Sequence, residues 1–313
     1  MPSLEIPAVL AALEARGWRA RAVPLGRLRD LAARMAAWRA GAGGVDAVAA
    51  TMDRYIDFRP PDELSETASV VVVVMPSPPA EATFVWRGEQ RRLGVPSNYP
   101  GNDENEAGVW QAIDELLAPH GVRRAATRLP EKLLTVSCGL ARYGRNNVAY
   151  VGEWGSYIQL VTRYVDLPCD EVEWTGPVLL ERCHDCDACR RACPTGAIGD
   201  DRFPLYVERC LTFHNENAGE LPAWIDATAH NSLIGCVRCQ RVCPADAGVR
   251  DWVGEKAAFD EGETALLLDA SRHGELSAGT RGKLQRLGLL ADYLPPLPRN
   301  LALLLEGDSG RAG

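Results

Sequence analysis

Apolar residues recur at helical spacing near both ends of the chain. Residues 6–15 and 25–40 combine many Ala with apolar positions three or four residues apart, which predicts two amphipathic helices. Residues 103–117 predict a third helix, with acidic side chains in the first turn, where they suit the helix dipole. Beyond residue 250 the same spacing predicts short helices over residues 261–268, 280–287 and 300–305.

Strand-like segments separate these helices. Five consecutive valines, Val70–Val74, are closed by a Pro-rich stretch, which predicts a strand buried on both faces. Residues 87–101 read as a polar loop, and residues 131–137 as a short helix. Two further strand-like runs follow, over residues 148–151 and 157–165. Helices and strands without a regular alternation predict the α+β class.

Eight of the ten cysteines lie between Cys183 and Cys243, and their spacing predicts metal binding. The run Cys183–Pro194 reads C-x2-C-x2-C-x3-C-P, a spacing in which three thiolates hold one iron–sulfur cluster and the fourth reaches its neighbour. The run Cys236–Pro244 has one cysteine fewer, and the isolated Cys210 supplies it. Zinc, the alternative, favours separated C-x2-C pairs.

The eight cysteines therefore predict two [4Fe–4S] clusters, each with one ligand exchanged between the motifs. The predicted ligands of cluster 1 are Cys183, Cys186, Cys189 and Cys243, and those of cluster 2 are Cys193, Cys210, Cys236 and Cys239. Cys138 and Cys169 remain unassigned. They are interpreted as small buried residues, with a catalytic thiol as the alternative.

Composition and charge restrict the expected partners and the expected compartment of the protein. The 313 residues carry a net charge of −8, which disfavours nucleic acid as a partner. The first residues carry no export signal, and no apolar run approaches the length of a membrane span. Clustered thiols without disulfide-rich composition suit a reducing compartment, so we expect a cytoplasmic protein without a membrane partner.

Glycines gather between the last predicted helix of the first half and the cysteine motifs. Gly139, Gly144, Gly152 and Gly155 permit left-handed backbone and the close approach of a bulky ligand. The alternative is that they serve turns.

These residues carry a family resemblance. The order CGLARYGRNN over Cys138–Asn147, EWGS over Glu153–Ser156, and Asp166-Leu167-Pro168, followed by the two-cluster motif, resembles the corrinoid-dependent iron–sulfur reductases. These comprise the epoxyqueuosine reductases and the reductive dehalogenases. The resemblance is strongest over residues 129–248.

The resemblance implies an architecture and a cofactor. It implies a nitroreductase-like cobalamin-binding domain over residues 1–176, a ferredoxin-like double [4Fe–4S] domain over 177–250, and a short helical C-terminal cap over 251–313. Cobalamin would be bound in its base-off form and receive electrons from the nearer cluster. By position, its neighbours would be Gly139, Gly144, Asn146, Gly155 and Ser156.

One departure from the family concerns the proton donor. Epoxyqueuosine reductase carries a catalytic Asp some fourteen residues before the first Gly of this segment, and an ungapped count places Ala125 there. The proton must then come from another group, and Tyr99, Tyr143 and Glu131 are the candidates beside the expected ligand region.

The resulting expectation is a cobalamin-dependent iron–sulfur reductase of a small molecule, supplied by an external low-potential electron donor. The alternative is an electron-transfer protein without its own substrate, which reductively activates a partner corrinoid protein. An epoxyqueuosine-type tRNA reductase is a minor alternative because the catalytic Asp is not found. A flavin in place of cobalamin is the remaining one.

Overall fold

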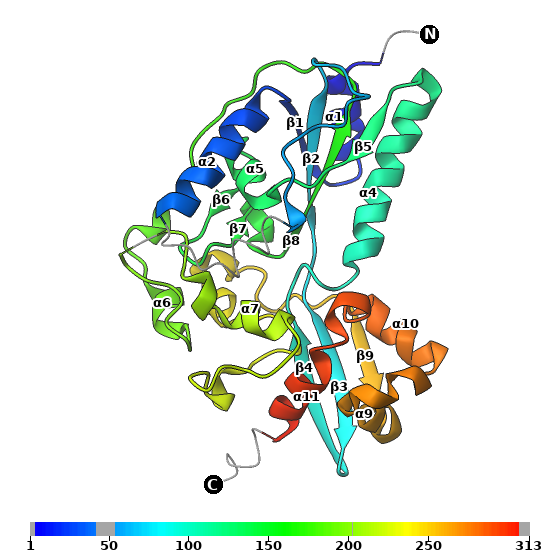
Figure 1. The fold of residues 1–313 in the computed structure, drawn as a ribbon, viewed down its shortest axis with the longest axis vertical. Helices are drawn as coiled ribbons and strands as arrows, with labels where there is room; N and C mark the ends of the chain where they lie inside the picture. Colours follow the sequence, from blue (N-terminus) through cyan, green and yellow to red (C-terminus); the bar gives the residue numbers. More distant parts are fainter. Residues whose placement is uncertain (1–3, 42–53, 202, 307–313) are drawn as a thin grey trace.

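The computed structural model describes residues 4–41, 54–201 and 203–306, and its larger lobe is built on a four-stranded antiparallel sheet (Figure 1). The strand order is β1-β2-β8-β5. The strands are β1 (Arg19–Pro24), β2 (Ser69–Pro76), β8 (Ile158–Val165) and β5 (Arg124–Ala126). The valine run forms the centre of β2, so the sequence's most apolar segment occupies the middle of the sheet.

Helices cover both faces of this sheet. On one face, α1 (Ile6–Glu14) and α4 (Asn102–Leu117) enclose a core that includes Val71 and Val73. On the other, α2 (Arg27–Gly41) and α5 (Glu131–Ser137) pack against Val70 and Val72. Alternating side chains of one strand thus enter two cores. The prediction of a strand buried on both faces is confirmed, since all five valines are fully buried.

A second, three-stranded sheet forms the smaller lobe, in the order β4-β3-β9. The hairpin of β3 (Ala80–Trp86) and β4 (Glu89–Val95) pairs with β9 (Lys256–Phe259), which runs parallel to β3. Phe84 stacks on Phe259 with ring centroids 4.7 Å apart. Helices α9 (Glu261–Leu268), α10 (Ala278–Arg286) and α11 (Leu297–Glu306) complete its core.

This lobe differs from the sequence-based expectation in two places. Residues 89–95, expected within a polar loop, form β4, and the segment expected as a purely helical cap also contributes β9. The reason is tertiary: β4 is polar on its outer face, and β9 has only four residues, so each is held by pairing with β3 rather than by its own pattern.

The cysteine-rich segment lies between the two lobes and consists mainly of loops and short helices (Figure 1). Its α-helices are α6 (Ala188–Ala192), α7 (Leu211–Glu216) and α8 (Arg238–Arg241). Leu233 and Ile234 anchor it in the core of the second sheet. A small hairpin, β6 (Arg142–Tyr143) and β7 (Ala149–Tyr150), packs against the main sheet and α5 of the larger lobe.

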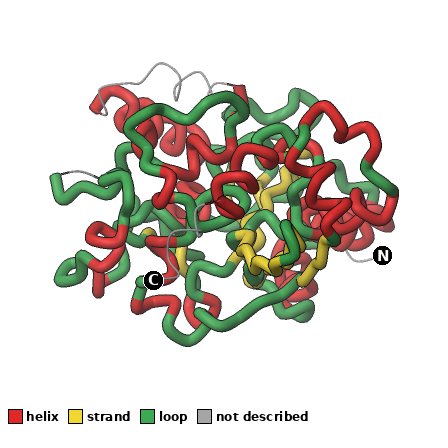
Figure 2. The backbone as a smooth tube through the Cα atoms, turned by 90° about the horizontal axis from the view of Figure 1, so that it is seen from below, coloured by secondary structure: helices red, strands yellow, loops and turns green. Residues whose placement is uncertain are grey.

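Short 3₁₀ helices connect many of these elements. They are η1 (Ala118–His120), η2 (Gly152–Trp154), η3 (Glu181–Cys183), η4 (Val207–Arg209), η5 (Ala227–Ala229), η6 (Pro244–Asp246), η7 (Ala270–Glu275) and η8 (Ala291–Tyr293). Seen from below, the strands lie in the interior with helices and loops around them (Figure 2). The α+β class is confirmed, and the three domain boundaries stay predictions. Among the described helices, none is both long and apolar enough to cross a membrane.

We expect Gly288→Ala to destabilise the junction of the two lobes. Gly288 ends α10 with φ +66°, and a Cβ there would lie 1.8 Å from the carbonyl oxygen of Tyr99. The strain predicts a loss of roughly 1–3 kcal/mol in the free energy of unfolding, measured by urea denaturation. Gly274→Ala is the matched control, because a Cβ there meets nothing within 4 Å, and it should change stability by less than about 0.5 kcal/mol. Equal effects of the two substitutions would contradict this account.

Candidate functional site

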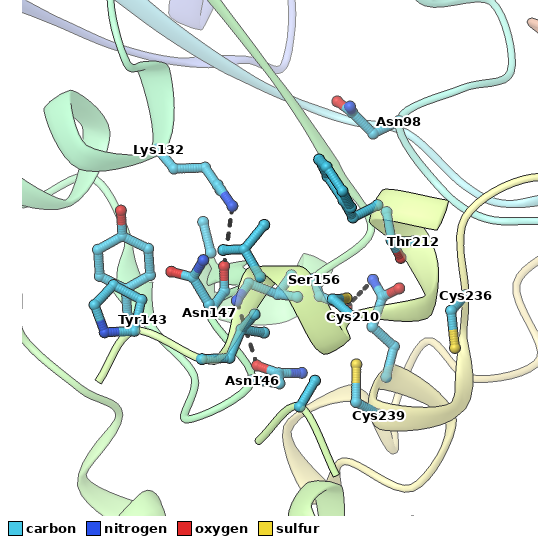
Figure 3. A pocket seen from close by; sticks show the side chains of 18 of the residues that line it. Asn98, Lys132, Tyr143, Asn146, Asn147, Ser156, Cys210, Thr212, Cys236 and Cys239 are labelled. Carbon is cyan, nitrogen blue, oxygen red and sulfur yellow. Dashed lines mark hydrogen bonds between the residues drawn. The ribbon is translucent and has the colours of Figure 1, made fainter. Parts of the chain in front are cut away.

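A cavity of about 930 Å³ opens where the larger lobe, the cysteine-rich segment and the C-terminal segment meet. Ile158 and Leu160, at the start of β8, line it from the larger lobe. Side chains of α7 line it from the cysteine-rich segment, and Tyr293 of η8 lines it from the C-terminal segment. Figure 3 shows Lys132 and Tyr143 on one side of this space and Cys236 and Cys239 on another. This volume includes the space that an iron–sulfur cluster bound to the cysteines in the cavity wall would fill. It lies near the upper end of the range of small-molecule and cofactor sites.

The structure brings cysteines of the two motifs close to one another. Burial, followed by the negative charges of Cys183, Cys243 and Cys186, raises the pKa of the Cys189 thiol to about 11. Cys189 also packs with Cys193, Cys210 and Cys239 in one small cluster, and its charge acts on Cys239, so the cysteines of the two sets adjoin one another. Cys183, Cys186, Cys189 and Cys243, here called the first group, are the ligands expected for cluster 1, and this assignment stays a prediction.

Cys193, Cys210, Cys236 and Cys239, here called the second group, are the ligands expected for cluster 2. Burial and the charges of Cys236 and Cys210 raise the pKa of Cys239, and Cys193 acts likewise on Cys210 and Cys236. All four of these cysteines line the cavity. The first group does not appear among the described cavity residues. Its Cys183 and Cys189 are buried, and Cys186 and Cys243 are half-buried. Within the described residues, the second group therefore faces the cavity and the first does not.

The surroundings of the sulfur atoms suit iron–sulfur clusters. The backbone N–H of Ala197 donates to Cys193 Sγ at 3.3 Å, and the Asn231 amide donates to Cys236 Sγ at 3.2 Å. Crowded, buried thiols resist ionisation unless a cation compensates their charge, and iron provides it. Within the described residues, no group of His, Cys, Asp or Glu closes on a single metal ion. The fit to clusters rests on the grouping, the burial and these sulfur hydrogen bonds.

Glu131 offers the cavity a carboxylic acid that keeps its proton at neutral pH. It begins α5, lines the cavity, and accepts a hydrogen bond from the Thr162 hydroxyl at 3.1 Å. Burial raises the pKa of this carboxyl to about 8, although the Thr162 hydroxyl opposes the shift. A carboxyl with such a pKa can serve as a general acid. Of the three predicted proton donors, it has the pKa closest to neutrality.

Lys132, which the sequence analysis did not select, lies beside it in the cavity. Its Nζ donates to the backbone oxygen of Asn147 at 3.2 Å, as Figure 3 shows. This side chain lines the cavity and retains solvent exposure, and desolvation by the surrounding protein lowers its pKa. The charges of Cys210 and Glu216 oppose this effect. A ligand in the cavity would thus meet one acid and one amine from consecutive residues.

The two predicted tyrosine donors also line the cavity, in different settings. Tyr99 donates its hydroxyl hydrogen to Glu216 and packs edge-on against Tyr293. Burial, followed by the charge of Glu216, raises the pKa of Tyr99 well above its ordinary value. Tyr143 packs edge-on against Phe203, and burial alone raises its pKa. Both hydroxyls hold their protons more firmly than Glu131 does.

The predicted corrinoid neighbours divide into two sets. Asn146 and Ser156 line the cavity, whereas Gly139, Gly144 and Gly155 are not among the described residues that line it. A Cβ on Gly139, which has φ +75°, would lie 3.0 Å from the Arg21 guanidinium, so this glycine serves a turn against β1. The structure thus favours the turn interpretation for these glycines.

Gly155 and Ser156 join the cavity wall to the second cysteine motif. The buried Asp246 accepts hydrogen bonds from the Ser156 backbone N–H and hydroxyl, both at 2.7 Å, and the Gln240 amide donates to the same hydroxyl at 2.9 Å. A Cβ on Gly155 would lie 2.2 Å from an Asp246 carboxylate oxygen. These hydrogen bonds hold the segment with Cys239 and Cys243 against the larger lobe, because Cys239 directly precedes Gln240 and Cys243 lies three residues before Asp246. Sequence reasoning missed Gln240 and Asp246 because no nearby motif or spacing indicates a contact with Ser156.

The two remaining cysteines are neutral thiols away from the clusters. Cys138 is fully buried and donates to the Thr135 backbone oxygen at 3.4 Å, while Cys169 packs at the edge of the other core. Burial raises the pKa of each thiol to about 11. A thiol with this pKa is a poor nucleophile at neutral pH, and neither cysteine lines the cavity within the described residues.

Comparisons with known proteins agree with this site. The family described as "4Fe-4S double cluster binding domain" matches residues 182–246, which contain all eight cysteines. The epoxyqueuosine reductase of Escherichia coli strain K12 is 30% identical over 196 residues, which cover 59% of this chain and 50% of that protein. The chain therefore spans about half the length of the curated relatives it matches.

Solved structures show the same fold. A selenomethionine-labelled epoxyqueuosine reductase aligns with a TM-score of 0.64 at 19% identity, over 96% of this chain and 80% of the other. An epoxyqueuosine reductase with an epoxyqueuosine-modified tRNA stem loop aligns with a TM-score of 0.50 at 20% identity, over 76% and 64%. The expectation that nucleic acid is disfavoured as a partner is wrong in the light of these relatives. Net charge describes the whole surface, whereas a tRNA loop is recognised at one local site.

We expect Cys236→Ala to remove the iron of one cluster, because it deletes a thiolate of the cavity-side group. Iron content after anaerobic reconstitution should fall to about half that of the parent protein. Cys169→Ala is the control, since it deletes a cysteine outside both groups and should leave the iron content unchanged. An unchanged iron content in Cys236→Ala would contradict the assignment of the second group.

Proposed function

We propose, from the premise that the chain is a divergent member of the epoxyqueuosine reductase-like family of iron–sulfur proteins, that it reduces a substrate in the central cavity with the help of a bound corrinoid. Its eight cysteines would hold two [4Fe–4S] clusters, which supply single electrons when assembled. The observation that carries the proposal is the cavity itself, lined by all four cysteines of one group and by a carboxyl that retains its proton.

The residues around the cavity fit a corrinoid. Apolar side chains such as Ile158 and Leu160 provide surface for a macrocycle, and Asn146, Ser156 and Lys132 provide groups that can hydrogen-bond its amide substituents. When bound, a corrinoid supplies a low-potential metal centre for one-electron chemistry. The chain's own contribution would be to orient it, exclude water and set its distance from Cys193, Cys210, Cys236 and Cys239.

The order of the two sites gives electrons a direction. The first group does not line the cavity within the described residues, so an external low-potential donor would reach it first. The second group lines the cavity and would receive electrons next. A protein that only relays electrons to a partner needs no buried cavity of this size beyond its second cluster, which favours an enzyme over the electron-transfer alternative.

Glu131 would supply the proton. Its carboxyl faces the cavity and is protonated below about pH 8, and the Thr162 hydroxyl fixes one of its oxygens at 3.1 Å. This residue stands in for the aspartate of the family's sequence pattern, whose ungapped position is occupied by Ala125. Lys132 would carry positive charge beside it and favour a negatively charged reaction product.

The substrate class follows from the relatives. Those proteins are named for the reduction of epoxyqueuosine, and one structure holds a tRNA stem loop carrying that nucleoside. We therefore place an epoxide-bearing modified nucleoside of tRNA first among the substrates. A nucleoside in an anticodon-type loop can leave its stack and enter a pocket, because bases in single-stranded loops are readily unstacked.

The test is binding and turnover in one preparation. Anaerobically reconstituted protein, loaded with cobalamin and reduced, should bind the cofactor tightly and convert epoxyqueuosine to queuosine in a tRNA stem loop, as read by mass spectrometry of the nucleosides. An electron paramagnetic resonance spectrum showing only free cobalamin would contradict the corrinoid proposal. Tight binding without turnover of tRNA would contradict the substrate but retain the cofactor.

We expect Glu131→Gln to lower the rate of reduction by roughly 10²–10⁴-fold, because it removes a general acid. In the parent protein the rate should fall as pH rises through about 8, since the carboxyl then loses its proton. Glu131→Gln should remove this pH dependence. Glu14→Gln on the surface of α1 is the control and should match the parent, and a parent-like rate in Glu131→Gln would contradict the role.

The stability of the same variant separates chemistry from folding. The pKa of Glu131 rises from an ordinary 4.5 to about 8, so the folded state binds the extra proton. The stabilisation of the folded state by this bound proton is fully present below about pH 4.5 and is lost as pH rises through about 8. Glu131→Gln cannot ionise, so relative to the parent its melting temperature should improve between pH 6 and pH 9. A melting temperature that falls at both pH values would attribute the lost activity to misfolding.

A further inference from the structure

The proposed reduction consumes more protons than Glu131 can hold. Removing an epoxide oxygen as water leaves a carbon–carbon double bond and takes two electrons and two protons. A neutral carboxyl gives up a single proton, after which it is a carboxylate. Glu131 must therefore be reprotonated, or a second donor must act, while the substrate still fills the cavity.

Two threonine hydroxyls form a pair between β5 and β8. These strands are antiparallel, with Ala126 opposite Arg163, and the next step of the same register places Thr127 opposite Thr162. The two hydroxyl oxygens lie 2.5 Å apart. Threonines in this cross-strand position hydrogen-bond to each other, so a proton can pass between them.

Thr162 connects this pair to Glu131. It is 2% exposed, and its hydroxyl donates to Glu131 Oε1 at 3.1 Å. Side chains alternate along a strand, so Thr162 shares one face of β8 with Ile158 and Leu160, which line the cavity. Neither Thr162 nor Thr127 is among the described residues that line it. The hydroxyl pair thus reaches Glu131 from behind the cavity wall.

Thr127 is the outer member of the pair. It directly follows β5, the edge strand of the sheet, and it is half-buried between two exposed residues, Ala126 and Arg128. Its hydroxyl also donates to the Thr162 backbone oxygen at 3.2 Å, and rotation toward the Thr162 hydroxyl completes the path. Three oxygen atoms therefore connect the sheet edge to the carboxyl at the cavity.

This path separates the oxygen that loses a proton from the oxygen that regains one. Because Oε1 of Glu131 accepts from Thr162, the acidic proton lies on Oε2, which gives it to the substrate. The carboxylate then takes the Thr162 hydrogen at Oε1, Thr162 takes that of Thr127, and Thr127 takes a proton from solvent water. Each hydroxyl breaks one O–H bond and forms another, so the net transfer is one proton from solvent to the carboxylate. Rotation of the hydroxyls and of the carboxyl restores the starting arrangement.

We propose that Thr127 and Thr162 form a proton path that reloads Glu131 from solvent during turnover and so supplies the second proton of the reduction. The proposal rests on the proposed function, in which Glu131 is the proton donor to an epoxide. Both threonines act through Glu131, so they are positioning residues. Lys132, the neighbouring amine in the cavity, is the alternative source of the second proton.

The first test is the steady-state reduction of epoxyqueuosine in a tRNA stem loop by the reconstituted, cobalamin-loaded protein. Thr127→Val replaces the hydroxyl by a methyl group and should lower kcat roughly 10–100-fold with KM unchanged, because proton delivery is interrupted outside the cavity. Thr127→Ser keeps a hydroxyl and should restore kcat. Thr135→Val is the matched control and should match the parent, since this buried hydroxyl on α5 has no hydrogen-bond partner among the described residues.

The pH profile distinguishes proton delivery from a general disturbance of the site. Thr127→Val leaves the Thr162 hydrogen bond to Glu131 in place, so the inflection should stay at about pH 8. Thr162→Val should lower kcat and move the inflection to higher pH, because the Thr162 hydroxyl lowers the pKa of Glu131. The charge of Glu106 on α4, which raises this pKa, and the adjacent Lys132 are present in both variants.

Infrared spectroscopy gives a second readout that needs no turnover. A neutral carboxyl has its own C=O band, which Glu131→Gln should remove. With cobalamin bound and the clusters oxidised, this band should shift after transfer to D2O as the carboxyl proton exchanges. Thr127→Val should slow the exchange by about the same factor as it lowers kcat, whereas Thr135→Val should not slow it.

The outcomes separate this path from the proposed function. A parent protein that does not reduce the stem loop would overturn the proposed function, whereas slowed exchange in Thr127→Val would still support the path. A parent protein that turns over, with parent-like kcat and exchange in both Thr127→Val and Thr162→Val, would overturn the path and assign the second proton to Lys132. A loss of kcat in Thr127→Val that Thr127→Ser does not restore would also overturn it.

Discussion

The gathering of eight cysteines in one segment, two of them buried and six half-buried, is the constraint on which the rest of this structure depends. Thiols crowded in a low-dielectric interior raise one another's pKa, so as thiolates they are stable only with a compensating metal charge. The expected crossed ligation would make the constraint cooperative. In that scheme Cys193 of the first motif binds the second cluster, and Cys243 of the second motif binds the first. Folding of this segment and assembly of both clusters are therefore expected to be one process.

The two lobes supply what the loop-rich cysteine segment cannot provide alone. Its own apolar clusters are small, and it is held from one side by Leu233 and Ile234 in the second core and from the other by Asp246 on Ser156. These anchors leave a cavity between one cysteine group and the buried carboxyl of Glu131. Four cysteines and a carboxyl thus face the same space from different parts of the chain, which is the arrangement that the proposed reduction requires.

Sequence reasoning predicted the parts of this molecule that have local signals. The valine run identified the central strand, residues 131–137 coincide with α5, and the cysteine spacing anticipated the double-cluster family match over residues 182–246. What it missed depends on contacts between distant segments. Strand β9 pairs with β3 some 175 residues earlier, Asp246 meets Ser156 across 90 positions, and Lys132 gains its setting only from the cavity. The expectation that nucleic acid is disfavoured as a partner was wrong for a related reason, because the overall net charge carries no information on the charge of a local site.

The most direct test of the account is the magnetic interaction between a bound corrinoid and the cavity-side cluster. In protein loaded with cob(II)alamin and reduced so that the clusters are paramagnetic, the cobalt resonance should be broadened or split, and Cys236→Ala should abolish this effect. Such a result would locate the electron source beside the cavity. A cobalt resonance from protein-bound cofactor that is unaffected by reduction of the clusters would contradict the central claim that this cavity is the electron-receiving site.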